Sequence, residues 1–338
     1  MFPGTTVGAG TRDFLTSDYT TITCGVPQRP ALVILAAGVS SRFGAAKQLE
    51  PVGPSGEALL DYAIHDAARA GFSDMVLVIR PEMEEEFREH MKQLLGGPAR
   101  LAYAPQELWN IPSGIEVPAG RRKPWGTAHA ILAAADYVEG PFAAVNADDL
   151  YGAAAYAQLA AHLTEFSAAE TPVFALVGYR LDETLSPSGG VSRGICTVGD
   201  DDFVESAMEI QDIRREADRI LGNTHDGTPH VLGGAELVSM NMWGFTPAIF
   251  PVLEQQFTRF VLEHASDPHA EFIIGDVVNR MVSGGQARLK ALRSEDQWAG
   301  LTYPDDKTRV TGRLRELVSE GAYPENLAAW FSTQRRDS

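Results

Sequence analysis

Residues 31–49 read A-L-V-I-L-A-A-G-V-S-S-R-F-G-A-A-K-Q-L. The continuous apolar run Ala31–Ala37 predicts a fully buried strand of the kind found in parallel sheets. The run ends at Gly38 in a loop of small residues, which lets backbone N–H groups approach an anion, and Arg42 and Lys47 add positive charge there. We interpret the stretch as a strand followed by a polyphosphate-binding loop, although neither G-x-x-x-x-G-K-[ST] nor G-x-G-x-x-G is present.

The composition of the 338 residues is that of an ordinary globular protein, with 44% hydrophobic and 22% charged residues. The net charge of −17 argues against a nucleic-acid or anionic-membrane partner, because either requires an exposed basic face. We find no stretch of transmembrane length and no signal-peptide pattern in the first residues. Cys24 and Cys196 lie far apart, which fits a reducing compartment, so we expect a cytoplasmic protein.

Strand-like and helix-like segments alternate after residue 30. We expect strands over Ala31–Ala37, Met75–Ile79, Phe142–Val145 and Val173–Gly178, and helices over Leu59–Ala70, Glu82–Leu95, Thr127–Tyr137, Tyr151–Phe166 and Lys307–Glu320. This order predicts a doubly wound, Rossmann-like α/β fold whose mixed, mostly parallel sheet is flanked by helices. Glycines punctuate shorter segments after residue 178, which indicates a smaller second lobe with antiparallel strands.

A pair of aspartates, Asp148 and Asp149, follows the predicted strand Phe142–Val145. The carboxyl ends of parallel strands are where α/β sheets bind ligands, and Mg²⁺ prefers one or two carboxylates together with phosphate oxygens. The pair therefore predicts a Mg²⁺ site beside the polyphosphate loop. An aspartate pair at a strand end can alternatively cap the helix that follows.

A third motif, R-R-K-P-W-G-T-A-H-A, covers residues 121–130. Gly126 and Thr127 open a predicted helix, where a close backbone approach and a hydroxyl suit a nucleobase or ribose. We interpret His129 as a buried helix histidine whose hydrogen bonds are satisfied. The basic residues 121–123 form either a solvated loop or, through Lys123, a further phosphate contact.

Taken together, L-A-A-G-x-S-S-R-F-G-x-x-K-Q-L and Ala147-Asp148 resemble the nucleotidylyltransferases, and specifically the sugar-phosphate nucleotidylyltransferases. These enzymes transfer a nucleoside monophosphate from a nucleoside triphosphate to a phosphorylated acceptor. The resemblance implies that Arg42 binds the β- and γ-phosphates, that Lys47 binds the reacting phosphates and that Asp148 holds Mg²⁺. It assigns nucleotide binding to Leu35, Ala36, Ala37, Gly38, Ser40, Ser41, Gln106, Gly126 and Thr127. The G-T-A-H-A element is similar to a uracil-binding turn of the uridylyltransferases, which favours UTP.

The resemblance is thinner in the second half of the chain. It implies an acceptor site made of Asp149, Gly190, Glu209, Asn241 and Asp276. Residues 298–306, W-A-G-L-T-Y-P-D-D, occupy the place of a family segment whose aspartate is the second metal ligand, and that position is a glycine here. We expect a shifted aspartate, Asp305 or Asp306, to substitute, with Asp306 taken as the ligand, unless the second ligand is missing.

The sequence thus predicts an N-terminal extension (1–29), a nucleotidylyltransferase domain (30–310) with a nucleotide-binding half (30–170) and an acceptor-binding half (171–310), and a C-terminal helical tail (311–338). The expected substrates are a nucleoside triphosphate and a sugar 1-phosphate, with Mg²⁺ as cofactor and no nucleic-acid or membrane partner. The sequence does not indicate an oligomeric state. Two alternatives stay open: a cytidylyltransferase of the molybdenum-cofactor or methylerythritol-phosphate type, and a nucleotide-binding regulator without turnover.

Overall fold

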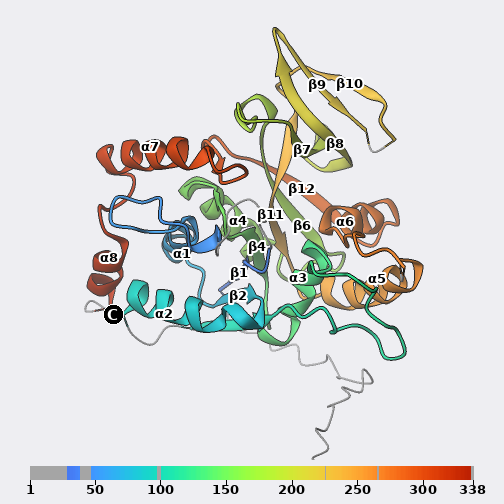
Figure 1. Cartoon of the computed structure of the whole chain (residues 1–338), viewed down its shortest axis with the longest axis horizontal. Coiled ribbons are helices and arrows are strands. Elements are labelled where there is room, and N and C mark those ends of the chain that lie inside the picture. Colours follow the sequence, from blue (N-terminus) through green and yellow to red (C-terminus); the bar gives the residue numbers. More distant parts are fainter. Residues whose placement is uncertain (1–28, 39–46, 97–99, 225, 265, 336–338) are drawn as a thin grey trace, which may run out of the picture.

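The computed structural model describes residues 29–38, 47–96, 100–224, 226–264 and 266–335, so nearly all of the predicted N-terminal extension lies outside the described part (Figure 1). Within that part the strands are β1 (Ala31–Leu35), β2 (Met75–Ile79), β3 (Leu101–Pro105), β4 (Phe142–Asn146), β5 (Asp149–Leu150), β6 (Val173–Arg180), β7 (Val191–Val198), β8 (Val204–Glu216), β9 (Arg219–Asn223), β10 (Pro229–Leu232), β11 (Leu237–Phe245), β12 (Arg288–Arg293) and β13 (Ala299–Gly300). The α-helices are α1 (Leu59–Ala70), α2 (Glu84–Leu95), α3 (Thr127–Ala133), α4 (Ala153–Glu165), α5 (Ile249–Glu263), α6 (Ile274–Ser283), α7 (Asp306–Ser319) and α8 (Leu327–Gln334).

The central sheet is built on parallel strands in the order β3–β2–β1–β4. β11 joins antiparallel to β4, and β6 and β12 continue the sheet beyond it. The chain winds away from β1 in both directions, so the strand order reverses between β1 and β4. Open α/β sheets bind ligands at such a reversal, outside the carboxyl ends of the strands. The predicted doubly wound, Rossmann-like fold is therefore confirmed.

Helices cover both faces of the sheet, and this is why its first strand is apolar throughout. In β1, Leu32 and Ile34 belong to the core that includes α1, α2 and α4. Ala31 and Val33 belong to the core on the other face, with α3, α5 and α6. All four side chains are buried.

The predicted helices form close to their expected positions, with two differences. Gly152 has a φ of +90°, a conformation that glycine adopts readily, so the chain turns there and α4 begins at Ala153 instead of Tyr151. The Tyr151 side chain is buried in the core. The helix expected over residues 127–137 divides into α3 and a 3₁₀ turn, Ala135–Tyr137. No helix in the described part of the chain combines the length and apolarity needed to cross a membrane.

A smaller lobe of antiparallel strands, β7 to β10, extends from the sheet, and β9 and β10 project away from the helices (Figure 1). β11 connects the lobe to the sheet, because its first part lies between β6 and β7 and its second part between β6 and β4. The register shifts between Ser239 and Met242, and Asn241 inside this bulge has a φ of +62°. The bulge therefore places Asn241 where the sheet and the lobe meet.

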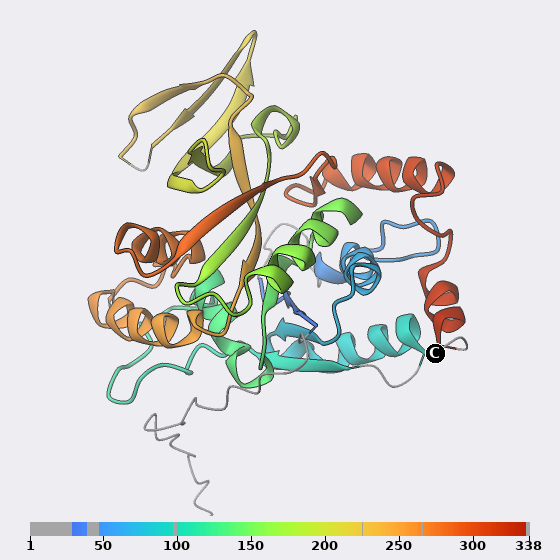
Figure 2. The ribbon, with the colours of Figure 1, turned by 180° about the vertical axis from the view of Figure 1, so that it is seen from behind.

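The C-terminal helices lie beside α1, as the rear view shows (Figure 2). Val310, Leu314 and Leu327 are fully buried in the core that includes α1. Between α7 and α8, the Tyr323 hydroxyl donates a hydrogen bond of 2.6 Å to Oδ2 of Asp66, which is also buried. The tail predicted from the sequence thus contributes to the core of the nucleotide-binding half.

Candidate active site

Two adjoining cavities lie in the described part of the chain at the reversal of the strand order. The first, of about 600 Å³, is lined by Leu35, Ala37, Gly38, Lys47, Gln48, Gln106, Lys123, Pro124, Gly126, Thr127, Ala130, Asn146, Asp148, Glu271, Ile273 and Thr302. The second, of about 380 Å³, includes Asp148, Asp149, Arg193, Glu209, Asn241, Asp276 and Trp298 in its lining. Thr127, Asn146, Asp148, Ile273 and Thr302 line both, so the two cavities are joined at Asp148.

Most of the residues predicted for the nucleotide line the first cavity, whereas most of those predicted for the acceptor line the second. Ala36 is fully buried in the core and lines neither cavity. Ser40, Ser41 and Arg42 lie outside the described residues, so their predicted phosphate contacts stay predictions.

Gly190 lines neither cavity, which corrects its assignment to the acceptor site. Its carbonyl oxygen accepts a hydrogen bond of 2.8 Å from the Tyr303 hydroxyl. A Cβ at this position would also overlap the carboxylate of Asp212. Glycine at residue 190 therefore allows a close approach to Asp212 of β8 within the lobe, while its carbonyl joins the lobe to the 302–306 turn.

An ion pair joins Lys47 and Asp148 at the first cavity. Lys47 opens a 3₁₀ turn directly after the predicted phosphate loop, and Asp148 follows β4. The side chains are 13% and 27% exposed, so each is held by its surroundings while remaining accessible from the cavity. Gln48 fixes the turn against the end of β1, since its Nε2 donates a hydrogen bond of 2.8 Å to the Gly38 carbonyl. A cation and a carboxylate thus stand together at the carboxyl ends of β1 and β4.

Asp149 is buried beside this pair. Its Oδ2 accepts hydrogen bonds from Nδ2 of Asn146 at 2.8 Å and from the Tyr151 hydroxyl at 3.1 Å. Burial raises the pKa of the Asp149 carboxyl to about 7, and the negative charge of Asp148 adds to the shift. The alternative that this residue only caps the next helix does not match its position, because it lies in β5 and lines the second cavity.

A chain of hydrogen bonds runs from β11 to Asp149. The Trp243 indole Nε1 donates to Oδ1 of Asn241 at 2.8 Å, and Nδ2 of Asn241 donates to Oδ1 of Asn146 at 2.6 Å. Nδ2 of Asn146 in turn donates to Asp149. An indole nitrogen can only donate, so the direction of every bond in the chain is set from Trp243. Neither Asn146 nor Trp243 was predicted to be a site residue. For Asn146 a signal exists in V-N-A-D-D, where it is the polar residue that ends an apolar strand.

The predicted base-binding turn is held against the segment before α6. Gly126 has a φ of +112°, and a Cβ there would lie 2.6 Å from the carbonyl oxygen of Phe272. The Thr127 hydroxyl accepts a hydrogen bond of 3.1 Å from the Ile274 backbone N–H. Nε2 of Gln106 donates to the Gly126 carbonyl at 3.1 Å, so this distant glutamine does lie at the turn, as the sequence comparison implied.

His129 is a buried helix histidine, as expected from the sequence. Its ring stacks on Phe257 with centroids 4.5 Å apart and an interplanar angle of 25°. Nδ1 lies 3.2 Å from Nε2 of Gln106. Burial lowers the pKa of His129 to about 4, so the ring is neutral at pH 7.

This lowered pKa predicts a pH-dependent stability. Between about pH 6.5 and pH 4 the unfolded chain binds a proton on His129 that the folded chain does not, so the free energy of unfolding falls as the pH falls. The loss reaches about 3 kcal/mol below the folded pKa. Urea unfolding of the wild type and of His129→Gln at pH 4–8 measures it, and the variant should show a flatter profile in that window. Parallel profiles would contradict the assignment.

The three basic residues 121–123 have separate environments. Arg121 is buried, stacks its guanidinium on Trp125 at 3.6 Å from the ring centroid, and donates to the carbonyl of Ala270 at 2.9 Å. Arg122 is exposed, and Lys123 lines the first cavity. Lys123 is therefore the member of the triplet that is placed to reach a ligand.

The second cavity carries groups that suit a polyhydroxylated ligand. Glu209 of β8 and Asp276 of α6 line it together with Asn241, and burial raises the pKa of Glu209. Arg193 is buried at the same wall and donates to the Thr184 carbonyl at 2.6 Å. Sequence analysis did not assign this arginine.

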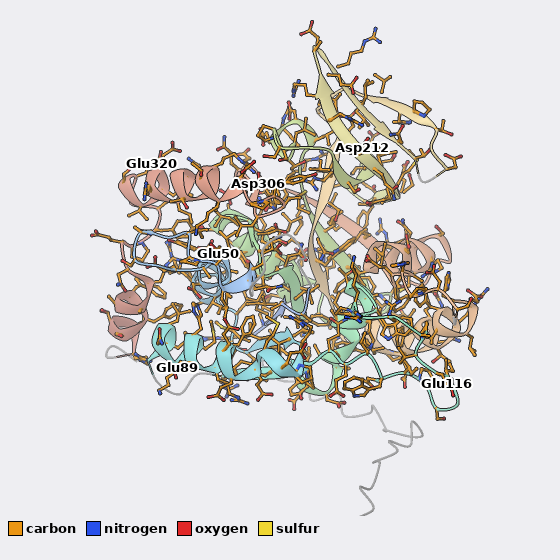
Figure 3. All side chains as sticks on the ribbon, in the orientation of Figure 1. Glu50, Glu89, Glu116, Asp212, Asp306 and Glu320 are labelled. Carbon is orange, nitrogen blue, oxygen red and sulfur yellow. The ribbon has the colours of Figure 1, made fainter. Side chains whose placement is uncertain are left out.

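The structure corrects the expectation that Asp306 is a metal ligand. This residue lies at the start of α7 (Figure 3) and is only 2% exposed. Its Oδ2 accepts hydrogen bonds from the backbone N–H groups of Thr302 at 3.0 Å and Tyr303 at 2.7 Å, and Oδ1 lies 3.3 Å from the Arg309 guanidinium. The carboxylate therefore holds the 302–306 turn in place. Neither Asp306 nor Asp305 lines either cavity.

Asp148 lies where the two cavities meet, so its carboxylate is placed to hold a divalent cation. Among the described residues, no three or more His, Cys, Asp and Glu side chains form a metal-binding group. Mg²⁺ does not require one, because it usually binds to one or two carboxylates and completes its shell with phosphate oxygens and water. The donor set at the end of β4 fits Mg²⁺ on this criterion.

The chain is similar to known proteins in part of its sequence and in its fold. Residues 32–175 match the family described as MobA-like NTP transferase domain. The fold is similar to those of the inositol-1-phosphate CTP transferase from T. maritima (TM-score 0.55, 13% identity, 86% of this chain and 98% of that chain) and of a UDP-glucose pyrophosphorylase in complex with UDP-glucose (0.56, 14%, 86% and 99%). It is also similar to HddC from Yersinia pseudotuberculosis (0.51, 15%, 84% and 99%).

No curated protein matches the chain in sequence. At 13–15% identity the structural likeness establishes the fold alone. The sequence match contains most of β1, the loop sequence after it, the Gly126 turn and Asp148. Residues 32–175, which are less than half of the chain, are therefore similar in sequence to the MobA-like NTP transferase domain.

Proposed function

We propose that the chain transfers a nucleoside monophosphate, with UTP as the favoured donor, to a sugar 1-phosphate and releases pyrophosphate. The observation that carries this proposal is the Lys47–Asp148 pair at the junction of the two cavities. One cavity has a Gly-Thr turn suited to a nucleobase, and the other has hydrogen-bonding side chains suited to a polyol. The reacting phosphorus would lie between them, next to both charges.

The reaction would be a direct displacement in which an acceptor phosphate oxygen attacks the α-phosphorus and pyrophosphate leaves. Such transfers depend on positioning and charge neutralisation more than on covalent chemistry by the protein. The Lys47 ammonium would stabilise the charge that develops on the phosphates. Glu209, Asn241 and Asp276 would hold the acceptor through its hydroxyl groups. Arg42 would bind the leaving pyrophosphate.

A divalent cation bound to Asp148 would neutralise part of the triphosphate charge. The protein's own contribution at that point is to keep the carboxylate at the carboxyl end of β4. The backbone carbonyl of Asp148 assists, since it accepts a hydrogen bond of 3.1 Å from the Leu301 N–H and so ties the 148–149 segment to β13.

A second candidate is cytidylyl transfer to a phosphorylated acceptor that is not a sugar. The likeness of the fold to that of an inositol-1-phosphate CTP transferase favours it. The second cavity does not distinguish the two, because a cyclic polyol and a sugar offer the same hydroxyl groups to Glu209 and Asp276.

The test is to incubate the full chain with Mg²⁺, each nucleoside triphosphate, and a panel of hexose 1-phosphates and inositol 1-phosphate, and to follow pyrophosphate. We expect release that depends on both a triphosphate and a sugar 1-phosphate. Release with CTP and a non-sugar acceptor alone would select the second candidate. Tight nucleotide binding without pyrophosphate across the panel would instead indicate a regulator without turnover.

A further inference from the structure

Asp149 occupies the space next to Gly300. β5 and β13 pair antiparallel, with Asp149 directly opposite Gly300. A Cβ at Gly300 would overlap both Oδ1 of Asp149 and the ring of Trp298. Glycine is therefore required at residue 300 because the carboxylate from the neighbouring strand fills the position of its side chain.

The two oxygens of Asp149 have different surroundings. Oδ2 accepts the hydrogen bonds from Asn146 and Tyr151, whereas Oδ1 has no hydrogen bond to any described residue. The residue is only 7% exposed, and it lines the second cavity together with Asp148. Oδ1 is not fully enclosed, so the oxygen without a hydrogen bond is open to the second cavity and available to a bound cation.

The hydrogen-bond chain from Trp243 determines which carboxylate oxygen of Asp149 is left for a ligand. The indole N–H orients Asn241, which orients Asn146, whose Nδ2 then donates to Oδ2 of Asp149. Outer partners of this kind orient metal-binding carboxylates and usually contribute tenfold or more to metal affinity. The strained φ of +62° at Asn241 is explained by the same requirement, since the bulge brings its amide between Trp243 and Asn146.

We infer that Asp149 is the second carboxylate of the divalent-cation site beside Asp148, and that Trp243, Asn241 and Asn146 position it. It takes the role for which the sequence comparison expected an acidic side chain at residue 300. This inference rests on the proposed function only in taking Asp148 as the first carboxylate of the site.

The test measures Mn²⁺ binding to the full chain without nucleotide, by the electron paramagnetic resonance signal of free Mn²⁺. In Asp149→Asn the new side chain can keep the oxygen that accepts from Asn146 and Tyr151, while an amide nitrogen replaces Oδ1. We expect the affinity to fall about tenfold or more. Gly300→Ala, which crowds Oδ1 and leaves both carboxylates in the sequence, should also weaken binding.

Asp306→Asn is the matched control, because it neutralises another buried carboxylate of the 298–306 region. Its Mn²⁺ affinity should equal that of the wild type, and thermal melting identifies any variant that is not folded. The inference is overturned if Asp149→Asn and Gly300→Ala both bind Mn²⁺ as the wild type does, if only Asp306→Asn weakens binding, or if the wild type shows no saturable binding.

A separate variant tests whether the hydrogen bonds that run from Trp243 to Asp149 position the carboxylate. Trp243→Phe removes the indole N–H and retains the ring, so Mn²⁺ affinity should fall roughly tenfold while the melting temperature changes little. Unchanged affinity would exclude that role. If the wild type releases pyrophosphate but the variants bind Mn²⁺ as it does, the inference is rejected and the proposed function is not. If the variants bind Mn²⁺ more weakly but the wild type releases no pyrophosphate, the proposed function is rejected and the inference is not.

Discussion

Lys47→Ala should lower the rate constant for pyrophosphate release by a factor of about 10²–10³, which corresponds to roughly 3–4 kcal/mol of transition-state stabilisation. The ammonium is held in place beside Asp148 at the junction of the two cavities, so it need not reorganise as charge builds on the phosphates. The dissociation constant for the nucleotide, measured by calorimetry, should change much less than kcat. Activity close to that of the wild type would show that Lys47 does not contact the reacting phosphates.

Lys123→Ala is the matched control for this experiment. Lys123 lines the same cavity, but it is exposed, and exposed charges contribute little. We expect a small effect on kcat and a modest increase in KM for the triphosphate. A loss as large as that of Lys47→Ala would mean that general positive charge in the cavity, rather than position beside Asp148, determines the rate.

Gly126→Ala should destabilise the folded chain by about 3 kcal/mol. A φ of +112° costs a residue with a Cβ roughly 1–3 kcal/mol, and overpacking against the Phe272 backbone costs a similar amount. Chemical denaturation measures the change. A displaced turn would also move two groups near the predicted nucleobase: the Gly126 carbonyl, which accepts from Gln106, and the Thr127 hydroxyl, which accepts from Ile274. Nucleotide affinity should therefore fall as well.

Gly275→Ala provides the comparison. This glycine lies in α6 close to the same turn, and a Cβ on it would meet no atom within 4 Å. Alanine in a helix is preferred over glycine by roughly 0.5–1 kcal/mol, so this variant should be as stable as the wild type or slightly more stable. If Gly126→Ala were equally well tolerated, the Phe272 segment would have to be able to move away from the turn.

Local pattern was sufficient to predict most elements of the nucleotide-binding half, although it missed β3 (Leu101–Pro105). The apolar run at Ala31, the amphipathic helix before Gly71 and the second strand from Met75 form within about two residues of their predicted limits. Each is specified by its own periodicity and by a glycine or polar residue at its end. The location of Asp148 followed from the same logic, because the end of a buried parallel strand is fixed by where the apolar residues stop.

The parts of the site that were mispredicted or missed depend on contacts between distant segments. Asn146 and Asn241 are 95 residues apart in sequence, and they meet only because β11 runs antiparallel beside β4. No periodicity encodes that pairing. Asp306 was expected to be a metal ligand because it lies near the family segment that carries one, but the sequence does not show that its carboxylate accepts from the backbone of its own turn.

Residues 323–327 complete the core around α1. Beyond the contact of Tyr323 with Asp66, the Leu327 N–H donates to the Glu57 carboxylate at 3.2 Å, and the Ser55 hydroxyl donates to the Glu325 carbonyl at 2.9 Å. A ribosome makes these residues long after the helix that they pack against. We therefore expect the half that contains Asp148 to stay incompletely packed until residues 323–327 have emerged, so that chains stalled before residue 323 are degraded by proteases that the folded protein resists.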